Sequence, residues 1–288
     1  GLGNGLWGDA HMRRSWLDDF RAVDDRHLYC MGANNDLGWK GAKDGEDMYI
    51  TCRVGGGEGF STHARTSFSF ADADNGGILN WLRPNTTRDF SGVVPLAGKP
   101  IVSHETCQFQ IYPDYRDIPK YTGVLYPYNL ETLRNRLNEN GLTPQVDAFH
   151  QATGRWAVEC YKADMEQCLR TLGFGGYQLL DIKDYPGQGS ALVGILDAFM
   201  DSKGLVEPAT FRQWNSQIVP LALMPAYCYS TADTLCADIA ISNYSEDEHH
   251  QPLTWTLAVD GGESVQGEIE EVDAWQGNVT NIGRIAIP

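Results

Sequence analysis

The sequence predicts an α/β fold for residues 1–204, followed by an all-β domain over residues 205–288. Two observations predict the first part: strand-like runs alternate with helical patterns, and each run turns polar at its C-terminal end. The third observation is a change of pattern after residue 204. There, apolar and polar residues alternate and turn residues recur every 8–12 positions or so, without a helical pattern.

Four short runs in the first part are expected to be strands, each followed by a loop and a helical pattern. They are "RHLYCMGANN" (26–35), "EDMYITCRV" (46–54), "KPIVSHET" (99–106) and "GYQLLDIKDYPGQG" (176–189). Strands and helices in alternation are typical of parallel α/β architecture, because a helix carries the chain back to the start of the next strand.

Helices are expected at about 10–24, 129–140, 144–172 and 189–201. The first has four apolar residues at helical spacing: Met12, Trp16, Phe20 and Val23. In the second, we expect Asn129 to cap the N-terminus and Gly141 to stop the helix.

Polar side chains gather where the strand-like runs end. They are Asn34 and Asn35, Arg53, His104 and Glu105, and Asp181 and Asp184. A parallel strand buried on both faces is apolar throughout, and a (β/α) barrel places its active site at the C-terminal ends of its strands. The alternative is an open doubly wound sheet, which binds ligands at the same edge. No G-x-G-x-x-G follows a strand, and "GGGEG" at 55–59 lacks that spacing, so we interpret it as a loop.

The C-terminal part carries the alternation clearly in "CADIAISNYSEDEHHQPLTWTLAVDGGESVQGEIEEV" (236–272). This pattern predicts a β-sandwich of the immunoglobulin-like type. His249 and His250 lie in a polar turn, which favours a solvated hairpin over a metal site.

The net charge, the lengths of the apolar runs and the cysteine spacing argue against several classes of partner and site. The formal net charge of -16 argues against nucleic acid and against an anionic membrane surface as partners, because both attract basic patches. No apolar run approaches the roughly 18–20 residues of a membrane span. The seven cysteines include no C-x-x-C pair, so zinc is not expected and buried free thiols are, with one disulfide open if the protein is exported.

Three segments together resemble glycoside hydrolase family 2. "GLGNGLWGD" (1–9), followed by a helix, is similar to the strand-four motif of that family and its clan. "KPIVSHETCQF" (99–109) is similar to the strand-seven segment, and "YQLLDIKDYPGQGSALVGILDAFMDSKG" (177–204) resembles strand eight and the following helix in bacterial members. The resemblance covers essentially the whole chain. It implies the C-terminal half of a (β/α)8 TIM barrel, from the end of strand four to strand eight, followed by an immunoglobulin-like sandwich.

The same resemblance implies an activity: retaining hydrolysis of O-glycosidic bonds in a glycan, without a cofactor or metal. A carbohydrate is then the expected partner, and a bacterial protein of this kind is expected to be secreted or periplasmic. Glu105 aligns with the nucleophile and Asn4 with the residue that contacts the sugar 2-hydroxyl.

Gly5 falls on the position of the general acid/base, which is a departure from the family. Retaining hydrolysis needs two carboxyl groups about 5–5.5 Å apart, and glycine supplies none. Because a placed acid contributes roughly 10²–10⁴ in rate, we expect impaired activity on unactivated glycosides. Three explanations stay open: a Glu-to-Gly change in a normal enzyme, a binding-only homologue, and a misassigned terminus.

Other residues are candidates for substrate binding, each with a structural alternative. Trp7, Trp81 and Tyr112 are candidates for stacking on a sugar face, or are core aromatics. Asn34 and Asn35 supply donors and acceptors for hydroxyl groups, or form a turn.

The charged candidates lie at the C-terminal ends of three of the expected strands. Arg53 is expected to keep Glu105 ionised, and His104 either orients Glu105 or is structural. Of Asp181 and Asp184, one is expected to bind hydroxyl groups and the other to cap a helix, with Lys183 paired to one of them.

A family 2 barrel also has strands one to four, which this sequence does not contain. We expect this N-terminal half from a further segment of a longer protein or from another chain, because four strands leave open edges. The rival hypothesis from another class is a non-catalytic carbohydrate-binding protein of the same fold. An oxidoreductase is disfavoured because the dinucleotide fingerprint is absent from the sequence.

Overall fold

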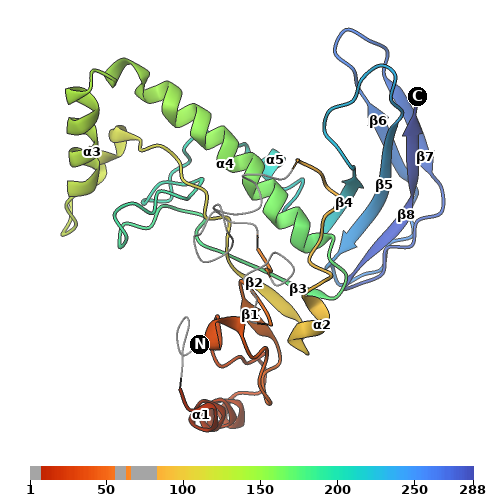
Figure 1. Cartoon of the computed structure of the whole chain (residues 1–288), viewed down its shortest axis with the longest axis horizontal. Coiled ribbons are helices and arrows are strands. Elements are labelled where there is room, and N and C mark those ends of the chain that lie inside the picture. Colours follow the sequence, from red (N-terminus) through yellow and green to blue (C-terminus); the bar gives the residue numbers. More distant parts are fainter. Residues whose placement is uncertain (1–7, 56–62, 66–82) are drawn as a thin grey trace.

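The computed structural model describes residues 8–55, 63–65 and 83–288. Its first part contains a parallel sheet of order β1-β2-β3, formed by β1 (Tyr49–Thr51), β2 (Ile101–Thr106) and β3 (Phe174–Leu179). Ala33 adds a parallel bridge to Ile50 beside β1. Each of the four runs expected to be strands therefore contributes a parallel segment, and the segments lie in the order of the sequence (Figure 1).

Helix α1 precedes the strands of this sheet, and the other helices lie in the connections between them. The helices are α1 (Ala10–Val23), α2 (Val94–Ala97), α3 (Tyr128–Glu139) and α4 (Val146–Leu169), with 3-10 turns at Asn35–Gly38, Tyr115–Lys120 and Thr143–Gln145. The helices expected at 10–24, 129–140 and 144–172 are confirmed. Gly141 follows α3 with a φ of +68°, as expected of a residue that stops a helix. Asn129 is not the cap, because Pro127 precedes the helix and the Asn129 amide donates to the Gly189 carbonyl.

The helix expected at 189–201 is wrong. The segment is an irregular loop in which Leu196 forms bridges with Lys183 and Ser202. Gly194 lies so close to the backbone that a Cβ there would stand 2.2 Å from the Lys183 carbonyl carbon. Glycine and β-branched residues such as Val193 lower helix propensity, and the bridges fix the extended path instead.

The C-terminal part contains antiparallel sheets. One has the order β4-β5-β8, from β4 (Ile218–Leu223), β5 (Leu235–Asn243) and β8 (Asn278–Ile287); the other pairs β6 (Leu253–Leu257) with β7 (Val265–Ile269). A short helix, α5 (Pro208–Phe211), precedes β4. Ile241 of the larger sheet and Leu253 and Ile269 of the smaller one share a hydrophobic cluster, so the two sheets pack on each other.

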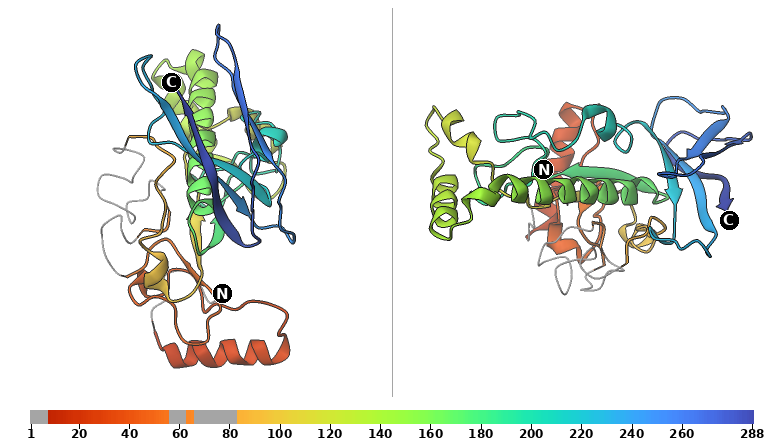
Figure 2. Two further views of the ribbon diagram at one scale, coloured as in Figure 1. Left: turned by 90° about the vertical axis from the view of Figure 1, so that its right-hand side faces the viewer. Right: turned by 90° about the horizontal axis from the view of Figure 1, so that it is seen from above.

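The long helix α4 joins the two parts (Figure 1 and Figure 2). Its buried face, which includes Ala157, Tyr161 and Met165, forms a hydrophobic cluster with the chain that follows β2. Leu169 at its end packs with Val219 of β4, and the Tyr244 hydroxyl donates to the Phe174 carbonyl at 2.9 Å. Parallel sheet and antiparallel sheets therefore share a continuous packed interior.

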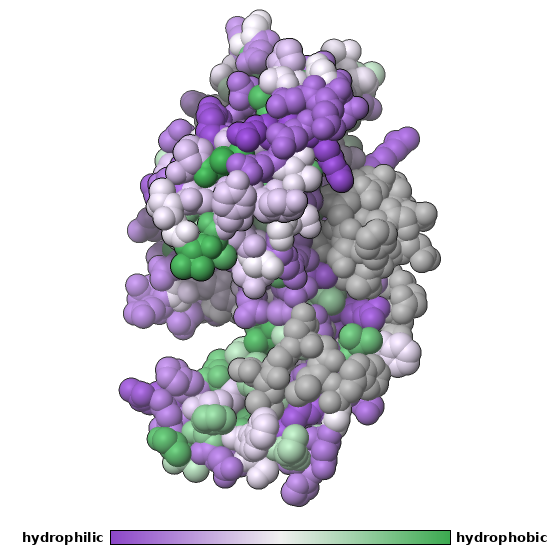
Figure 3. All heavy atoms as spheres, turned by 90° about the vertical axis from the view of Figure 1, so that its left-hand side faces the viewer, coloured by the Kyte–Doolittle hydropathy of each residue, from purple (hydrophilic) through white to green (hydrophobic). Residues whose placement is uncertain are grey.

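Helix α1 exposes the apolar residues that predict it. Met12, Trp16, Phe20 and Val23 are 49%, 44%, 63% and 88% exposed, and Figure 3 shows apolar side chains on the lower lobe that carries this helix. The buried residues of α1 are Arg13 and Leu17. The helical spacing therefore predicts the helix correctly, but the described residues do not cover its apolar stripe.

All seven cysteines are free thiols, as the sequence favours. Four of them are buried: Cys52, Cys107, Cys160 and Cys168. Within the described ranges, no helix has the length and apolar character needed to cross a membrane.

Candidate active site at the carboxyl edge of the parallel sheet

The carboxyl ends of the parallel segments lie side by side. Thr51 of β1 is in register with Ser103 of β2, and Thr106 of β2 is in register with Leu179 of β3. The Asn34 amide donates to the Ile50 carbonyl at 2.9 Å, which brings the first run to the same edge. The polar residues that the sequence places at the ends of its strands therefore share one edge of the sheet.

Glu105 lies at the end of the central strand β2, with a φ of +52° that only a minority of non-glycine residues adopt. Its side chain is 23% exposed. Two basic groups face its carboxylate: Arg65 Nη1 lies 3.2 Å from Oε2, and His104 Nε2 lies 3.5 Å from Oε1. The His104 imidazole, followed by the Arg65 guanidinium, lowers the pKa of Glu105, although partial burial opposes them. The carboxylate is therefore ionised at neutral pH and reachable from solvent.

Arg65 fixes the backbone at this point as well as the carboxylate. Its side chain is 3% exposed, and Nη1 donates to the carbonyls of His104 and Glu105 at 3.2 and 3.0 Å. The same nitrogen lies 3.3 Å from Gln108 Oε1. The unusual backbone angle of Glu105 is thus held by an arginine that bridges the residues around it.

His104 is oriented from the neighbouring strand. Its Nδ1 lies 2.7 Å from Oε1 of Gln178 in β3, so the imidazole stands between this amide and Glu105. Sequence reasoning names His104 but not Gln178 or Arg65. Arg65 lies in a loop without periodicity, and Gln178 falls inside a strand, so neither position carries a signal in one sequence.

Arg53 contacts the backbone of neighbouring segments, and its expected effect on the ionisation of Glu105 stays a prediction. Its Nε donates to the Leu37 carbonyl at 3.1 Å, and its backbone bridges His63. The Arg65 guanidinium lowers the pKa of Glu105. Both arginines are nearly buried, and they belong to segments that meet in this bridge.

Asn34 and Asn35 form the turn that was the structural alternative. Asn34 has a φ of +51°, and its side-chain oxygen accepts from the Cys52 amide at 2.8 Å and from the Thr51 hydroxyl at 3.1 Å. Asn35 is 1% exposed, and neither atom of its amide group has a hydrogen-bond partner. The Asn34 side chain thus holds the turn against the end of β1. Asn35 places a buried amide group without a hydrogen-bond partner at the same edge.

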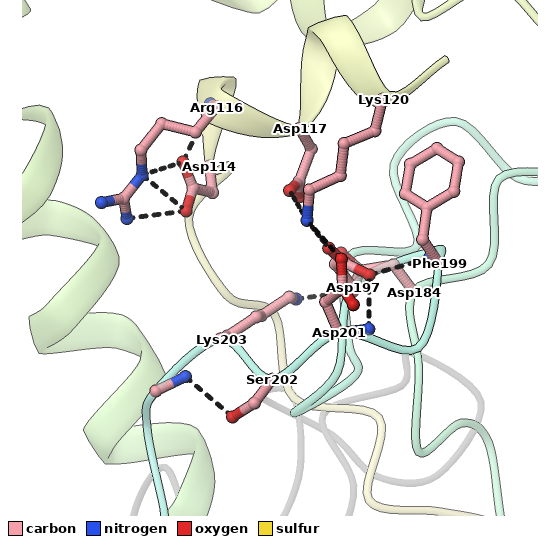
Figure 4. Close-up of polar contacts among 11 residues, drawn as sticks. Asp114, Arg116, Asp117, Lys120, Asp184, Asp197, Phe199, Asp201, Ser202 and Lys203 are labelled. Atoms are coloured by element: carbon pink, nitrogen blue, oxygen red, sulfur yellow. Dashed lines mark hydrogen bonds and ion pairs between the residues drawn. The ribbon is translucent and has the colours of Figure 1, made fainter. Parts of the chain in front are cut away.

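Asp184 forms a buried ion pair, but its partner is not the expected Lys183. Lys203 Nζ lies 2.7 Å from Asp184 Oδ1 (Figure 4). The same oxygen accepts from the Gly194 amide at 3.0 Å. Burial raises the pKa of Asp184 despite the lysine. The expected helix that it would cap is absent from the structure, so Asp184 holds the loop 184–203 closed instead.

Asp181 follows β3 and is half-buried, and its backbone carbonyl accepts from the Tyr161 hydroxyl at 2.7 Å. Of the two aspartates, Asp181 is therefore the one whose carboxyl group remains a candidate for binding hydroxyl groups.

A second acidic cluster was not anticipated from the sequence. Lys120 Nζ contacts Asp197, Asp117 at 3.1 Å and Asp201 at 3.0 Å, which ties the 3-10 turn at Tyr115–Lys120 to the loop at 197–201 (Figure 4). One ammonium group thus contacts three carboxylates, so Lys120 holds the two segments together while the acids outnumber the base.

The remaining candidates divide between core and undescribed residues. Tyr112 packs against Phe149 with ring centroids 5.3 Å apart and against Tyr115 at 6.4 Å, which fits the core alternative. Asn4, Gly5, Trp7 and Trp81 lie outside the described residues, as does most of "GGGEG". In the described part of the chain, no three His, Cys, Asp or Glu side chains are grouped to hold a metal ion.

Comparison with protein-family models and with curated proteins finds no match for this sequence.

Proposed function

We propose that the chain belongs to a retaining glycoside hydrolase resembling family 2, in which Glu105 is the nucleophile. Residues 1–204 would then form part of a (β/α)8 barrel, and residues 205–288 an immunoglobulin-like sandwich. The single observation that supports the proposal is the Glu105 carboxylate, ionised beside Arg65 and His104 at the carboxyl end of a central parallel strand.

The chemistry follows from that arrangement. A Glu105 oxygen attacks the anomeric carbon of the sugar, the bond from that carbon to the leaving oxygen breaks, and a glycosyl ester forms. Water then attacks the anomeric carbon and releases Glu105. The lowered pKa of Glu105 supplies the ionised form that the first step needs. Arg65 fixes the backbone and one carboxylate oxygen, which restricts the direction of attack.

Because Gly5 supplies no carboxyl group at the acid/base position, only some glycosides are expected to react. Without a general acid, the leaving oxygen departs unprotonated, so only glycosides with good leaving groups form the ester at a useful rate. Without a general base, water reacts slowly with the ester. Azide needs no base and should react faster.

The test is turnover of 2,4-dinitrophenyl glycosides of galactose, glucose, mannose and glucuronic acid, with and without sodium azide. We expect azide to accelerate turnover of one of these sugars and to yield a glycosyl azide of retained configuration. Glu105→Gln should abolish the reaction, whereas Glu139→Gln, at the exposed end of α3, should leave it unchanged. Turnover that persists in Glu105→Gln would contradict the proposal.

A non-catalytic carbohydrate-binding protein is the second candidate, and Gly5 is the observation that favours it. Calorimetric titration with the same four sugars, beside the turnover assay, separates the two. Binding without any azide-dependent turnover would favour the binding protein.

We also propose that the remaining barrel strands come from a further segment or another chain. The exposed stripe of α1 supports this, because a barrel helix packs its apolar face against neighbouring elements.

A further inference from the structure

The two faces of β3 have different surroundings. Tyr177 and Leu179 pack against the hydrophobic cluster that contains the buried face of α4. Gln178 lies between them in the sequence, and successive side chains of a strand point to opposite faces of the sheet. Gln178 is exposed, so it lies on the face turned away from α4 and takes no part in packing the interior.

Strand β2 presents His104 on the same face as Gln178. Ile101 and Ser103 are fully buried, whereas His104 is only partly buried. Ser103 is in register with Tyr177 of β3, and His104 and Gln178 follow this pair in the two neighbouring parallel strands (Figure 1). Their side chains meet there, because His104 Nδ1 lies 2.7 Å from Gln178 Oε1. This distance is that of a short hydrogen bond between the strands.

The bond to Gln178 decides where protons bind to the imidazole. An amide oxygen can only accept, so Nδ1 of His104 donates and holds a proton. A neutral imidazole has one such proton, and the hydrogen bond of one ring nitrogen sets the state of the other. The second proton of His104 therefore binds Nε2, the nitrogen that lies 3.5 Å from Glu105 Oε1. The ring thus gains or loses its charge at the atom that faces the carboxylate.

Two ionisable groups contact His104 in the described part of the chain. They are the Glu105 carboxylate and Arg65, whose Nη1 donates to the His104 carbonyl at 3.2 Å. Arginine stays protonated in proteins, so the charge that can change beside Glu105 is that of His104. The side chains of His104 and Glu105 are 13% and 23% exposed, so water screens their interaction only in part. The imidazole is accordingly the largest cause of the lowered pKa of Glu105.

We propose that Gln178 is a positioning residue for Glu105. By accepting from Nδ1, it holds the His104 imidazole with Nε2 towards the carboxylate and so maintains the ionised form of the nucleophile. Without Gln178, the imidazole can turn about its side-chain bonds, and its charge no longer has a fixed position beside the carboxylate. The role of Glu105 in catalysis rests on the proposed function, but the coupling of Gln178 to Glu105 through His104 is independent of it.

The experiment is a pH titration of the whole chain followed by NMR, with no sugar present. Glutamate labelled with carbon-13 at the carboxyl group reports the pKa of Glu105, and the Glu105→Gln variant identifies its signal. Gln178→Met keeps a side chain of similar length and removes the acceptor. Because His104 is then free to turn away, we expect the pKa of Glu105 to rise by about 0.5 to 1. Since Gln178 is exposed, the variant should fold like the wild type, which thermal unfolding checks.

Further variants show whether Gln178 acts through His104. In His104→Gln the pKa of Glu105 should rise, and adding Gln178→Met to it should cause no further rise. Gln188→Met is the matched control, because Gln188 is an exposed glutamine in the loop after β3, and it should leave the pKa of Glu105 unchanged. Nitrogen-15 shifts of the His104 ring should place the proton of the neutral ring on Nδ1.

Three results would overturn the proposal: an unchanged pKa of Glu105 in Gln178→Met, a rise of equal size when His104 has already been replaced, or a neutral His104 ring protonated on Nε2. Labelling of Glu105 by a 2-deoxy-2-fluoro glycoside separates this proposal from the proposed function. Coupling without label from any of the four sugars would support the role of Gln178 and contradict the glycosidase. Label without coupling would contradict the role of Gln178 alone.

Discussion

Glu105 and Asp184 are both carboxylates beside the carboxyl edge of the sheet, yet their ion pairs have opposite consequences. Asp184 has the shorter contact, 2.7 Å to Lys203, but its side chain is 7% exposed and burial raises its pKa. Glu105 has longer contacts, to Arg65 and His104, but is 23% exposed, and its pKa is lowered. The number of basic neighbours and the access of water therefore decide the ionisation, rather than the shortest distance. Asp184 stabilises a loop, and Glu105 is available for chemistry.

The largest expected effect on stability is at Asp184. Lys203→Met leaves a buried carboxylate without its cation and should lower the free energy of unfolding by about 3–5 kcal/mol. Urea denaturation at pH 7 measures this. The double variant Lys203→Met/Asp184→Asn should recover much of the loss. A loss below about 1 kcal/mol in Lys203→Met would remove the structural role given to Asp184.

The pH dependence of stability should differ in sign between the two residues. Glu105 has a lowered pKa in the fold, so its contribution is complete above the ordinary glutamate pKa of about 4.3 and is lost as pH falls through the folded pKa. Asp184 has a raised pKa, so it lowers stability as pH rises from about 3.9 through its folded pKa.

Urea unfolding of variants across this pH range checks the sign. Glu105→Gln should make stability rise less with pH, and Asp184→Asn should make it rise more. If the free energy of unfolding changed with pH in the same way in both variants, the opposite pKa shifts assigned to Glu105 and Asp184 would be contradicted.

A smaller effect on the stability of the fold is expected from the backbone conformation at position 105. Because Glu105 has a φ of +52°, Glu105→Gly should be more stable than Glu105→Ala by about 1 kcal/mol. Asp184 is not among the residues with positive φ, so Asp184→Gly should be less stable than Asp184→Ala. Thermal unfolding of the four variants compares the pairs. Equal stabilities at position 105 would mean that its backbone carries no strain.

The sequence predicts the parallel segments and their polar ends well, because apolar runs and the residues that follow them are local patterns. It predicts α1 from apolar spacing but not that Arg13 and Leu17, rather than that stripe, are its buried residues. Arg65 and Lys203 escape prediction for a related reason: which basic side chain reaches Glu105 or Asp184 depends on the path of long loops. The bridges made by Leu196 fix one such path and exclude the expected helix.

The central claim is that Glu105 is the nucleophile, and covalent labelling tests it most directly. A 2-deoxy-2-fluoro glycoside with a good leaving group needs no general acid and forms a long-lived ester, so Gly5 does not prevent the reaction. After incubation with the four sugars in this form, peptide mass spectrometry should find the added sugar on Glu105. Label on Asp181 or Asp184, or no label with any of the four, would contradict the account.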